Sequence, residues 1–280
     1  MPWRPIPPAP PTPACPDSHI VVTMLGDAAI AAFVRDGYVA VRGAVPSEII
    51  VTCREEIEEQ LRSSGVDPGD RATWKLPVVR LACPETPAFR AAGTQPGLWS
   101  IYDQLLGVGT WWRRAGVGGS IAVRFSVPGD PGDAGWHIDG SFDVGGEWWV
   151  NIASRERGLL SLFLLSDVGR HDAPTELKAG SHLDVAKVLE PHGDAGVNFG
   201  DVSRRLPPAT FERPSAFATG QAGDVFICHP FLVHRATWPH VGTLPRSIAQ
   251  PGVALIRPFT LDGIDPCPVE RAILAGLEPD

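Results

Sequence analysis

His137 and Asp139 are the residues whose types and spacing best suit chemistry in this chain. Side chains alternate between the two faces of an extended strand, so residues two apart point the same way and can hold one ion together. A neutral imidazole beside a carboxylate suits a divalent transition metal. A second histidine from elsewhere would complete a 2-His-1-carboxylate facial triad, the arrangement that holds non-haem iron(II).

A second His-x-Asp match, His182 and Asp184, shows that this pattern also arises by chance. We interpret it as the chance match, because we expect Asp184 to cap a short helix over 185–189, and a pair at a helix start does not share one strand face. His137 instead follows a loop rich in Pro, Gly and Asp at 128–135, at the mouth of an expected strand. Taken alone, His137 is equally compatible with a solvated loop histidine.

A third ligand is expected late in the chain, where residues 223–234 (GDVFICHPFLVH) hold two histidines. His229 precedes Pro230, which pushes its backbone toward extended geometry and suits a turn-shaping role. His234 ends the next apolar run, and His240 follows soon after. The residues alone leave the third position open among these histidines.

Arg246 opens an apolar run at 247–256 that predicts a strand. A lone cation in such a strand is costly unless an anion meets it. The planar guanidinium can hold a carboxylate through two parallel hydrogen bonds, which a lysine cannot copy. Arg246 is therefore a candidate partner for a dicarboxylate ligand.

The composition is that of an ordinary globular protein, because 280 residues with 44% hydrophobic content can bury a substantial core. No apolar run approaches the ~18 residues of a membrane span, and the proline-rich start lacks a signal-peptide pattern. We therefore expect a cytoplasmic protein with no membrane partner. The formal charge of −8 disfavours nucleic acid as a partner, since such binding needs clustered cations.

The five cysteines are scattered and form no C-x-x-C pair, which predicts reduced thiols rather than a disulfide framework or a zinc cluster. No pattern in the chain decides its oligomeric state.

The order of the expected elements predicts an α+β fold. Residues 1–18 are predicted to be a flexible, proline-rich tail, and 19–280 a single domain that is helical to about 118 and rich in strands after it. Helical spacing of apolar residues predicts helices with Asp27 and Ser47 as N-caps and a later one that ends at Gly107. Short apolar runs between turn residues predict strands at 38–41, 76–81, 121–127, 148–152, 159–167, 175–178, 224–228 and 247–256. This pattern is typical of a sandwich or jelly roll.

The stretch 191–220 shows little periodicity, and we expect a long loop there, while the sequence leaves open whether it is a lid over the site. Its Arg204 and Arg205 are interpreted as solvent-facing charge rather than an anion site.

Taken together, these segments resemble the phytanoyl-CoA dioxygenase family of Fe(II)/2-oxoglutarate-dependent oxygenases. Their order and spacing are more specific than any one of them, and the resemblance spans about residues 27–258. The matching segments are 33–39 (FVRDGYV), 136–139 (WHID), 180–182 (GSH) and 223–234, followed by Arg246. The resemblance implies a double-stranded β-helix, a jelly-roll and cupin-like core, preceded by helices.

The resemblance also implies roles for individual residues. His137, Asp139 and His234 would bind the iron, and Arg246 would hold the distal carboxylate of 2-oxoglutarate. Hydroxyl positions that assist the cosubstrate are similar to Thr175 or Thr237. At 172–175 the chain has Asp-Ala-Pro-Thr where many members have an Asn-Gly segment.

Such a site uses O2 and 2-oxoglutarate, releases succinate and CO2, and hydroxylates a C–H bond by default. Desaturation, cyclisation and epimerisation share the same ligands and stay open. Halogenases that resemble this pattern replace the carboxylate with a small residue, so the presence of Asp139 disfavours halogenation. Two rivals from other classes are a metal-binding jelly-roll protein without turnover and a zinc hydrolase.

Aromatic residues flank the metal pair, and the candidates for substrate contact are Trp136, Phe142 and Trp148. Aromatic faces beside carboxylates can hold a sugar, an amine or a flat ring. Strand core is an equally good interpretation for the tryptophan at 148. We expect a small-molecule substrate of the natural-product type, and hence a role in secondary metabolism.

Overall fold

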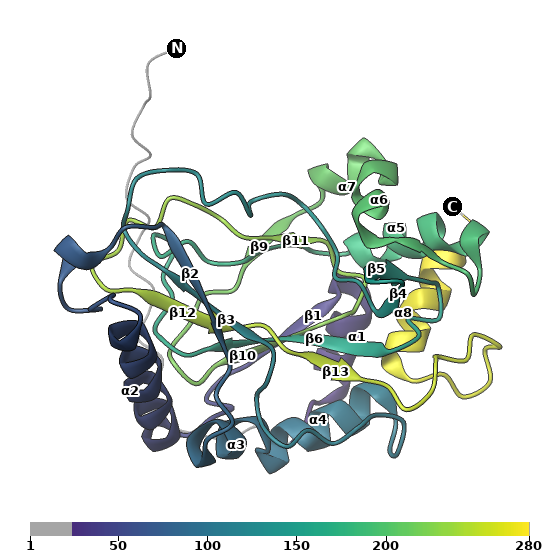
Figure 1. Cartoon of the computed structure of the whole chain (residues 1–280). Helices are drawn as coiled ribbons and strands as arrows, with labels where there is room; N and C mark the ends of the chain where they lie inside the picture. The colour runs from purple at the N-terminus through teal and green to yellow at the C-terminus, as the bar shows by residue number, and fades with distance from the viewer. Residues whose placement is uncertain (1–23, 280) are drawn as a thin grey trace.

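The computed structural model describes residues 24–279, so the expected tail at 1–18 lies outside the described residues. A seven-stranded antiparallel sheet crosses the middle of the molecule (Figure 1). In spatial order its strands are β1 (Tyr38–Val41), β10 (Val225–Cys228), β6 (Arg157–Leu164), β12 (Arg246–Ala249), β3 (Ser120–Arg124) and β2 (Val78–Ala82), with β13 (Gly252–Ala254) also paired to β6.

Two three-stranded antiparallel sheets complete the β structure of residues 24–279. One consists of β11 (His234–Arg235), β7 (Glu176–Lys178) and β9 (Ser215–Phe217), and the other of β4 (Phe142–Val144), β5 (Glu147–Val150) and β8 (Val197–Asn198). The large sheet faces the first of these across a buried apolar cluster that includes Leu162, Ile248 and Leu177. The coarse prediction of a mixed helix and sheet protein with antiparallel sheets is confirmed.

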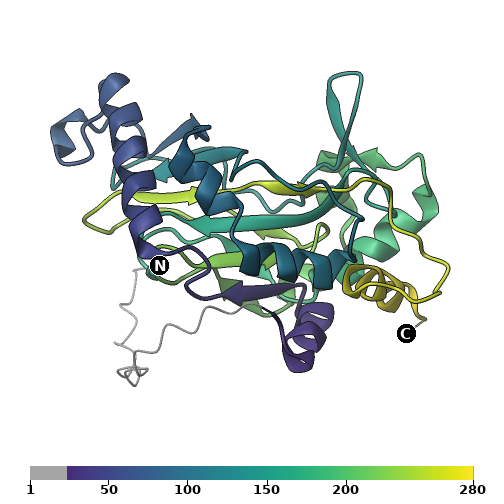
Figure 2. The ribbon, with the colours of Figure 1, turned by 90° about the horizontal axis from the view of Figure 1, so that it is seen from below.

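Helices cover the opposite face of the large sheet and one end of the molecule. The blue helices α2 (Ser47–Ser63), α3 (Pro87–Gly93) and α4 (Pro96–Leu106) cross the sheet face turned to the viewer in Figure 2. The remaining helices are α1 (Asp27–Asp36), α5 (Ser181–Leu189), α6 (Phe199–Arg205), α7 (Pro208–Glu212) and α8 (Pro268–Leu277), with short 3-10 turns at Arg71–Thr73 and Glu190–His192. None of the helices in the described part of the chain is long and apolar enough to cross a membrane.

Helical periodicity located the first helices correctly but missed their N-caps by one residue. In α2, Ile50, Cys53, Ile57 and Leu61 are buried at the spacing that places them on one face. The N-caps are Gly26 and Pro46 rather than the predicted Asp27 and Ser47, and neither makes a side-chain cap hydrogen bond, so the capping prediction was wrong. Both predicted residues instead begin their helices.

The β half contains two further corrections. The expected strand at 247–256 is two strands, β12 and β13, because Pro251 between them has no N–H to continue the ladder. The expected loop at 191–220 contains β8, α6, α7 and β9. These elements have at most seven residues each, which is too short for apolar periodicity to reveal.

All four cysteines in the described residues are free, namely Cys53, Cys83, Cys228 and Cys267, while Cys15 lies outside them.

Candidate metal centre

His137 and His234 are brought together by the backbone. They form an isolated antiparallel bridge, in which each backbone N–H donates to the carbonyl of the other, at 3.0 and 2.9 Å. A strand was expected around His137. The structure has only this single bridge there, because the residues on either side of His137 belong to no strand. The bridge still gives the local extended geometry on which the pairing of His137 with Asp139 depends.

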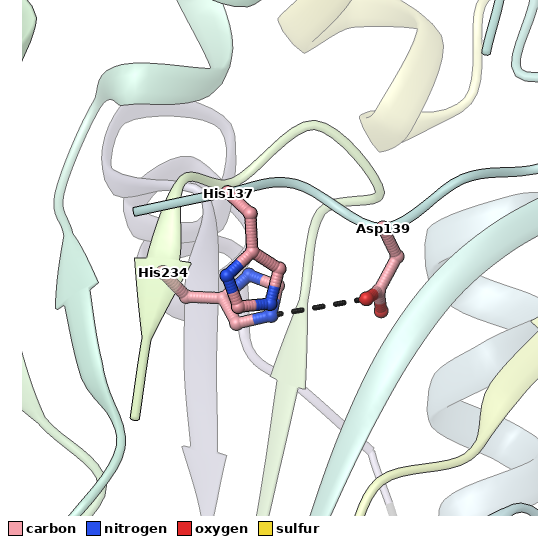
Figure 3. A group of neighbouring side chains, drawn as sticks. All are labelled: His137, Asp139 and His234. Carbon is pink, nitrogen blue, oxygen red and sulfur yellow. Dashed lines mark ion pairs between the residues drawn. The ribbon is translucent and has the colours of Figure 1, made fainter. Parts of the chain in front are cut away.

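The three side chains converge on one space, drawn in Figure 3. The imidazole centroids of His137 and His234 lie 4.4 Å apart. The Nε2 atom of His234 lies 4.0 Å from Oδ1 of Asp139. One potential ligand atom from each residue lies within 4.8 Å of the other two. Two imidazoles and a carboxylate are the donors that suit a divalent transition metal, so the residues fit such an ion.

Both imidazoles are held in the orientation that a metal ligand needs. Nδ1 of His137 lies 2.8 Å from the carbonyl oxygen of Gly135, and Nδ1 of His234 lies 2.9 Å from that of Leu232. A carbonyl accepts only, so each Nδ1 carries the proton and donates. Each Nε2 is then left with its lone pair for an ion, and hydrogen bonds of this kind set the ring orientation of metal-bound histidines.

Burial and neighbouring charge set the protonation states that metal binding requires. Burial and, after it, the charge of the nearby His137 lower the pKa of His234 to about 4. Burial alone would raise the pKa of Asp139, but Arg157 and the two histidines outweigh it, and the net pKa lies below the ordinary value. At neutral pH the site therefore presents a neutral His234 and an ionised Asp139.

The second His-x-Asp pair lies elsewhere and does not join this group. His182 and Asp184 both lie inside α5, whose N-cap is Gly180, so the predicted capping role of Asp184 was wrong. Asp184 accepts hydrogen bonds from Thr210 and Arg213. Neither residue of this pair belongs to the His137, Asp139 and His234 group.

The protein should lose stability in mild acid because the buried His182 resists protonation. Burial lowers its pKa to about 4 from 6.5, so the folded protein resists a proton that the unfolded chain takes up below pH 6.5. Its stabilising contribution is complete above pH 6.5 and falls as the pH drops toward 4, by about 2 kcal/mol at pH 5. Denaturant unfolding of the wild type and His182→Gln at pH 7.5 and 5 measures this loss. Parallel pH profiles in the two proteins would refute it.

The other two candidate histidines are committed to structure. His229 is buried, its Nδ1 accepts from the backbone N–H of Phe231 at 3.1 Å, and it thus shapes the turn around Pro230. Nε2 of His240 lies 2.7 Å from the carbonyl oxygen of Leu244. Neither side chain belongs to the His137, Asp139 and His234 group.

Arg246 begins β12, as predicted, and is only 2% exposed. Its Nε donates to the carbonyl of Asp172 at 3.3 Å, and an Nη donates to that of Ala173. Burial, and after it the charge of Arg124, lowers its pKa to about 9. Arg246 therefore stays protonated at neutral pH.

Arg124 is a second buried cation that the sequence reasoning missed. It is also 2% exposed, and it stands directly opposite Arg246 in the pairing of β3 with β12. Its Nη2 donates to Asp133 at 2.6 Å, whereas its Nε is buried with no partner among the described residues. The signal that selected Arg246, a lone cation in an apolar strand, was equally present at this position.

The two threonines differ in what their hydroxyls do. Thr175 is 1% exposed, and within the described residues its Oγ1 has no hydrogen-bond partner. Thr237 donates its hydroxyl to the carbonyl of Pro174 at 2.6 Å. Of the two, only Thr175 has a buried hydroxyl free for a ligand. Such an atom is costly to leave unpaired.

The predicted aromatic contacts separate into three environments. Neighbouring residues of an extended chain point to opposite faces, so Trp136 points away from the imidazole of His137. The guanidinium of Arg235 lies over the Trp136 ring, 4.4 Å from the ring centroid. Phe142 is 2% exposed, with Arg155 5.1 Å from its ring centroid. Trp148 is 51% exposed on β5. Trp148 is the most exposed of the three, and the substrate roles stay predictions.

The predicted solvent-facing arginines lie on α6. Arg204 is paired with Asp201, and an Nη of Arg205 lies 3.3 Å from Nε2 of His192. Both line a surface cavity of about 580 Å³ beside Trp149.

The sequence model of one protein family matches most of the chain. The sequence model of the family described as phytanoyl-CoA dioxygenase (PhyH) matches residues 33–238. This range includes the three converging side chains, and Arg246 lies beyond it. A search of the curated proteins finds no match.

Several solved structures share the fold. The epimerase SnoN in complex with Fe3+, alpha ketoglutarate and nogalamycin RO has a TM-score of 0.55 and 18% identity over 82% of each chain. The carbocyclase SnoK from nogalamycin biosynthesis has a TM-score of 0.54 and 18% identity, covering 87% of this chain and 92% of its own. HygX from Streptomyces hygroscopicus, with nickel, 2-oxoglutarate and hygromycin B bound, has a TM-score of 0.53 and 15% identity over 84% and 90%.

Proposed function

The chain belongs to the phytanoyl-CoA dioxygenase family, and we propose from this that it is an Fe(II)- and 2-oxoglutarate-dependent oxygenase. His137, Asp139 and His234 hold the iron. The large sheet and the β11–β7–β9 sheet, which enclose a common apolar cluster, form a double-stranded β-helix.

One observation carries the proposal: two oriented Nε2 atoms and an ionised carboxylate meet in one space, from segments about a hundred residues apart. A partly buried carboxylate and two imidazoles are costly to assemble without a ligand that uses them. An oriented group of this composition is what a 2-His-1-carboxylate iron site requires.

When bound, iron would supply the oxidation of a substrate C–H bond by O2 while 2-oxoglutarate is converted to succinate and CO2. The chain's own residues orient the reactants. Arg246 supplies a charged donor for the distal carboxylate of the cosubstrate, and Thr175 supplies a free hydroxyl. The carboxylate of Asp139 completes three protein ligands, which favours oxygen chemistry over halogenation.

We place the substrate among small natural-product molecules. The likeness to SnoN, SnoK and HygX, two from nogalamycin biosynthesis and one with hygromycin B bound, supports this class. Hydroxylation is the default outcome, and desaturation, cyclisation and epimerisation need only the same protein ligands. The exposed face of Trp148 is the open aromatic surface that such a molecule would meet.

A turnover assay tests the proposed function. The protein is loaded anaerobically with Fe(II), mixed with 2-oxoglutarate and a panel of natural-product intermediates, and exposed to O2. We expect succinate and CO2 to form in the wild type and not in His137→Ala. A zinc hydrolase or a binding protein without turnover consumes no 2-oxoglutarate, so no succinate from an iron-loaded protein across the panel would reject the proposal in favour of one of these.

A further inference from the structure

Arg157, the first residue of β6, links the side chain of a candidate ligand to the backbone beside it. Its Nη1 donates to Oδ2 of Asp139 at 3.1 Å, and its Nε donates to the carbonyl of Gly140 at 2.9 Å. The rigid plane of the guanidinium fixes these two donors relative to each other. Arg157 therefore sets both the rotation of the Asp139 carboxylate and the path of the chain that follows it.

The two oxygens of Asp139 consequently have different tasks. Oδ2 is engaged by Arg157, whereas Oδ1 faces Nε2 of His234 at 4.0 Å, as the dashed line in Figure 3 marks. A carboxylate held in this way offers one oxygen to an ion. A single-oxygen ligand leaves more coordination positions open than a chelating carboxylate does, and a chelating cosubstrate together with O2 needs three of them.

Gly252 on β13 makes room for this guanidinium. A Cβ atom at position 252 would lie 2.8 Å from Nη1 of Arg157 and 3.1 Å from its Cζ, closer than side chains normally approach. The backbone of Gly252 is outside the left-handed region, so its conformation does not by itself require glycine. Glycine suits this position because the guanidinium of Arg157 lies where a side chain would be. The residue paired with Arg157 across the sheet is Ala254.

We propose that Arg157 is a positioning residue that holds Asp139 as a single-oxygen metal ligand, with Gly252 providing the space it needs. The inference rests on the proposed function, because it requires a metal at His137, Asp139 and His234. The alternative is an ordinary ion pair that stabilises the fold and has no influence on the metal.

Cobalt(II) is the probe that separates the two, because its visible absorption reports ligand geometry without turnover. We expect Arg157→Gln to weaken Co(II) binding by about 10- to 100-fold, the usual cost of losing a residue that orients a ligand, and to change the absorption spectrum. Arg157→Lys keeps the charge but not the fork, so it should restore part of the affinity. Gly252→Ala should shift affinity and spectrum in the same direction, since it displaces the guanidinium without removing charge.

Arg213 provides a matched control. Its guanidinium forms a two-donor contact with Asp184, away from the metal site, and the pair has side-chain exposures of 32% and 16%, compared with 20% and 28% for Arg157 and Asp139. Arg213→Gln should lower the melting temperature and leave the Co(II) affinity and spectrum unchanged.

The outcomes are distinct. If folded Arg157→Gln keeps the Co(II) affinity and spectrum of the wild type, the role of Arg157 is overturned and the proposed function is not. If Arg157→Gln does not fold, the same result in Gly252→Ala overturns that role. A wild-type protein that binds neither Co(II) nor Fe(II) would instead overturn the proposed function.

Discussion

His234→Ala should lose stoichiometric Fe(II) binding, and His137→Ala and Asp139→Ala should do the same. Each substitution removes one of the three donors that converge on the space within residues 24–279. The bridge between positions 137 and 234 is made by backbone atoms, which alanine retains, so the fold should persist. Anaerobic titration with Fe(II), followed by removal of free metal and iron analysis, measures the loss.

Two other buried histidines are the controls for this experiment. His182→Ala and His229→Ala should destabilise the protein, because each removes a buried ring that bonds to backbone groups. Both folded variants should still bind one Fe(II). If His234→Ala retained its iron while His182→Ala or His229→Ala lost it, our assignment of the metal ligands would be wrong.

Arg246→Leu should weaken the binding of 2-oxoglutarate by roughly 30- to 5,000-fold. If this buried side chain holds the cosubstrate, the substitution removes a charged, two-donor contact and leaves the distal carboxylate unpaired, which costs on the order of 2–5 kcal/mol. That free energy converts to this range of affinities. Iron binding should survive, since Arg246 contributes no atom to the metal group. Equilibrium binding of 2-oxoglutarate to the anaerobic, iron-loaded protein checks both points.

The contacts of Arg246 also allow a purely structural role. It donates to the carbonyls of Asp172 and Ala173, so its loss leaves two acceptors without their donor. A structural role predicts a lower melting temperature and nearly unchanged 2-oxoglutarate affinity in the protein that stays folded. Arg246→Lys should fall between the wild type and Arg246→Leu if the contact is to the cosubstrate. Affinities within a few-fold across all three proteins would remove Arg246 from the site.

Arg124 explains why the surroundings of Arg246 should favour an anion more strongly than the sequence suggested. Two guanidinium groups that stand opposite each other in a buried ladder repel one another, and Asp133, which also pairs with Arg80, neutralises only part of this charge. A bound carboxylate would relieve the repulsion. The signal for Arg124 was in the sequence, but its significance depends on the strand pairing that sets it beside Arg246.

Local features of the sequence were sufficient for helix periodicity and strand alternation, although they placed the N-caps of the first helices one residue late. The spacing of Ile50, Cys53, Ile57 and Leu61 predicted α2, because a helix repeats every few residues regardless of what lies beyond it. The alternation that put His137 and Asp139 on one side is likewise a property of neighbouring residues. The family resemblance then selected His234, a choice that spacing had left open.

Only the tertiary structure decided which distant residues meet. The bridge between His137 and His234, the register that sets Arg124 against Arg246, and the room that Gly252 leaves for Arg157 all depend on backbone pairings between segments far apart in the chain. Such pairings follow from how whole sheets pack, and one strand's sequence does not encode its partner's register. Residue types and short spacings therefore determined what chemistry this protein can perform, and long-range register determined which side chains are in position to perform it.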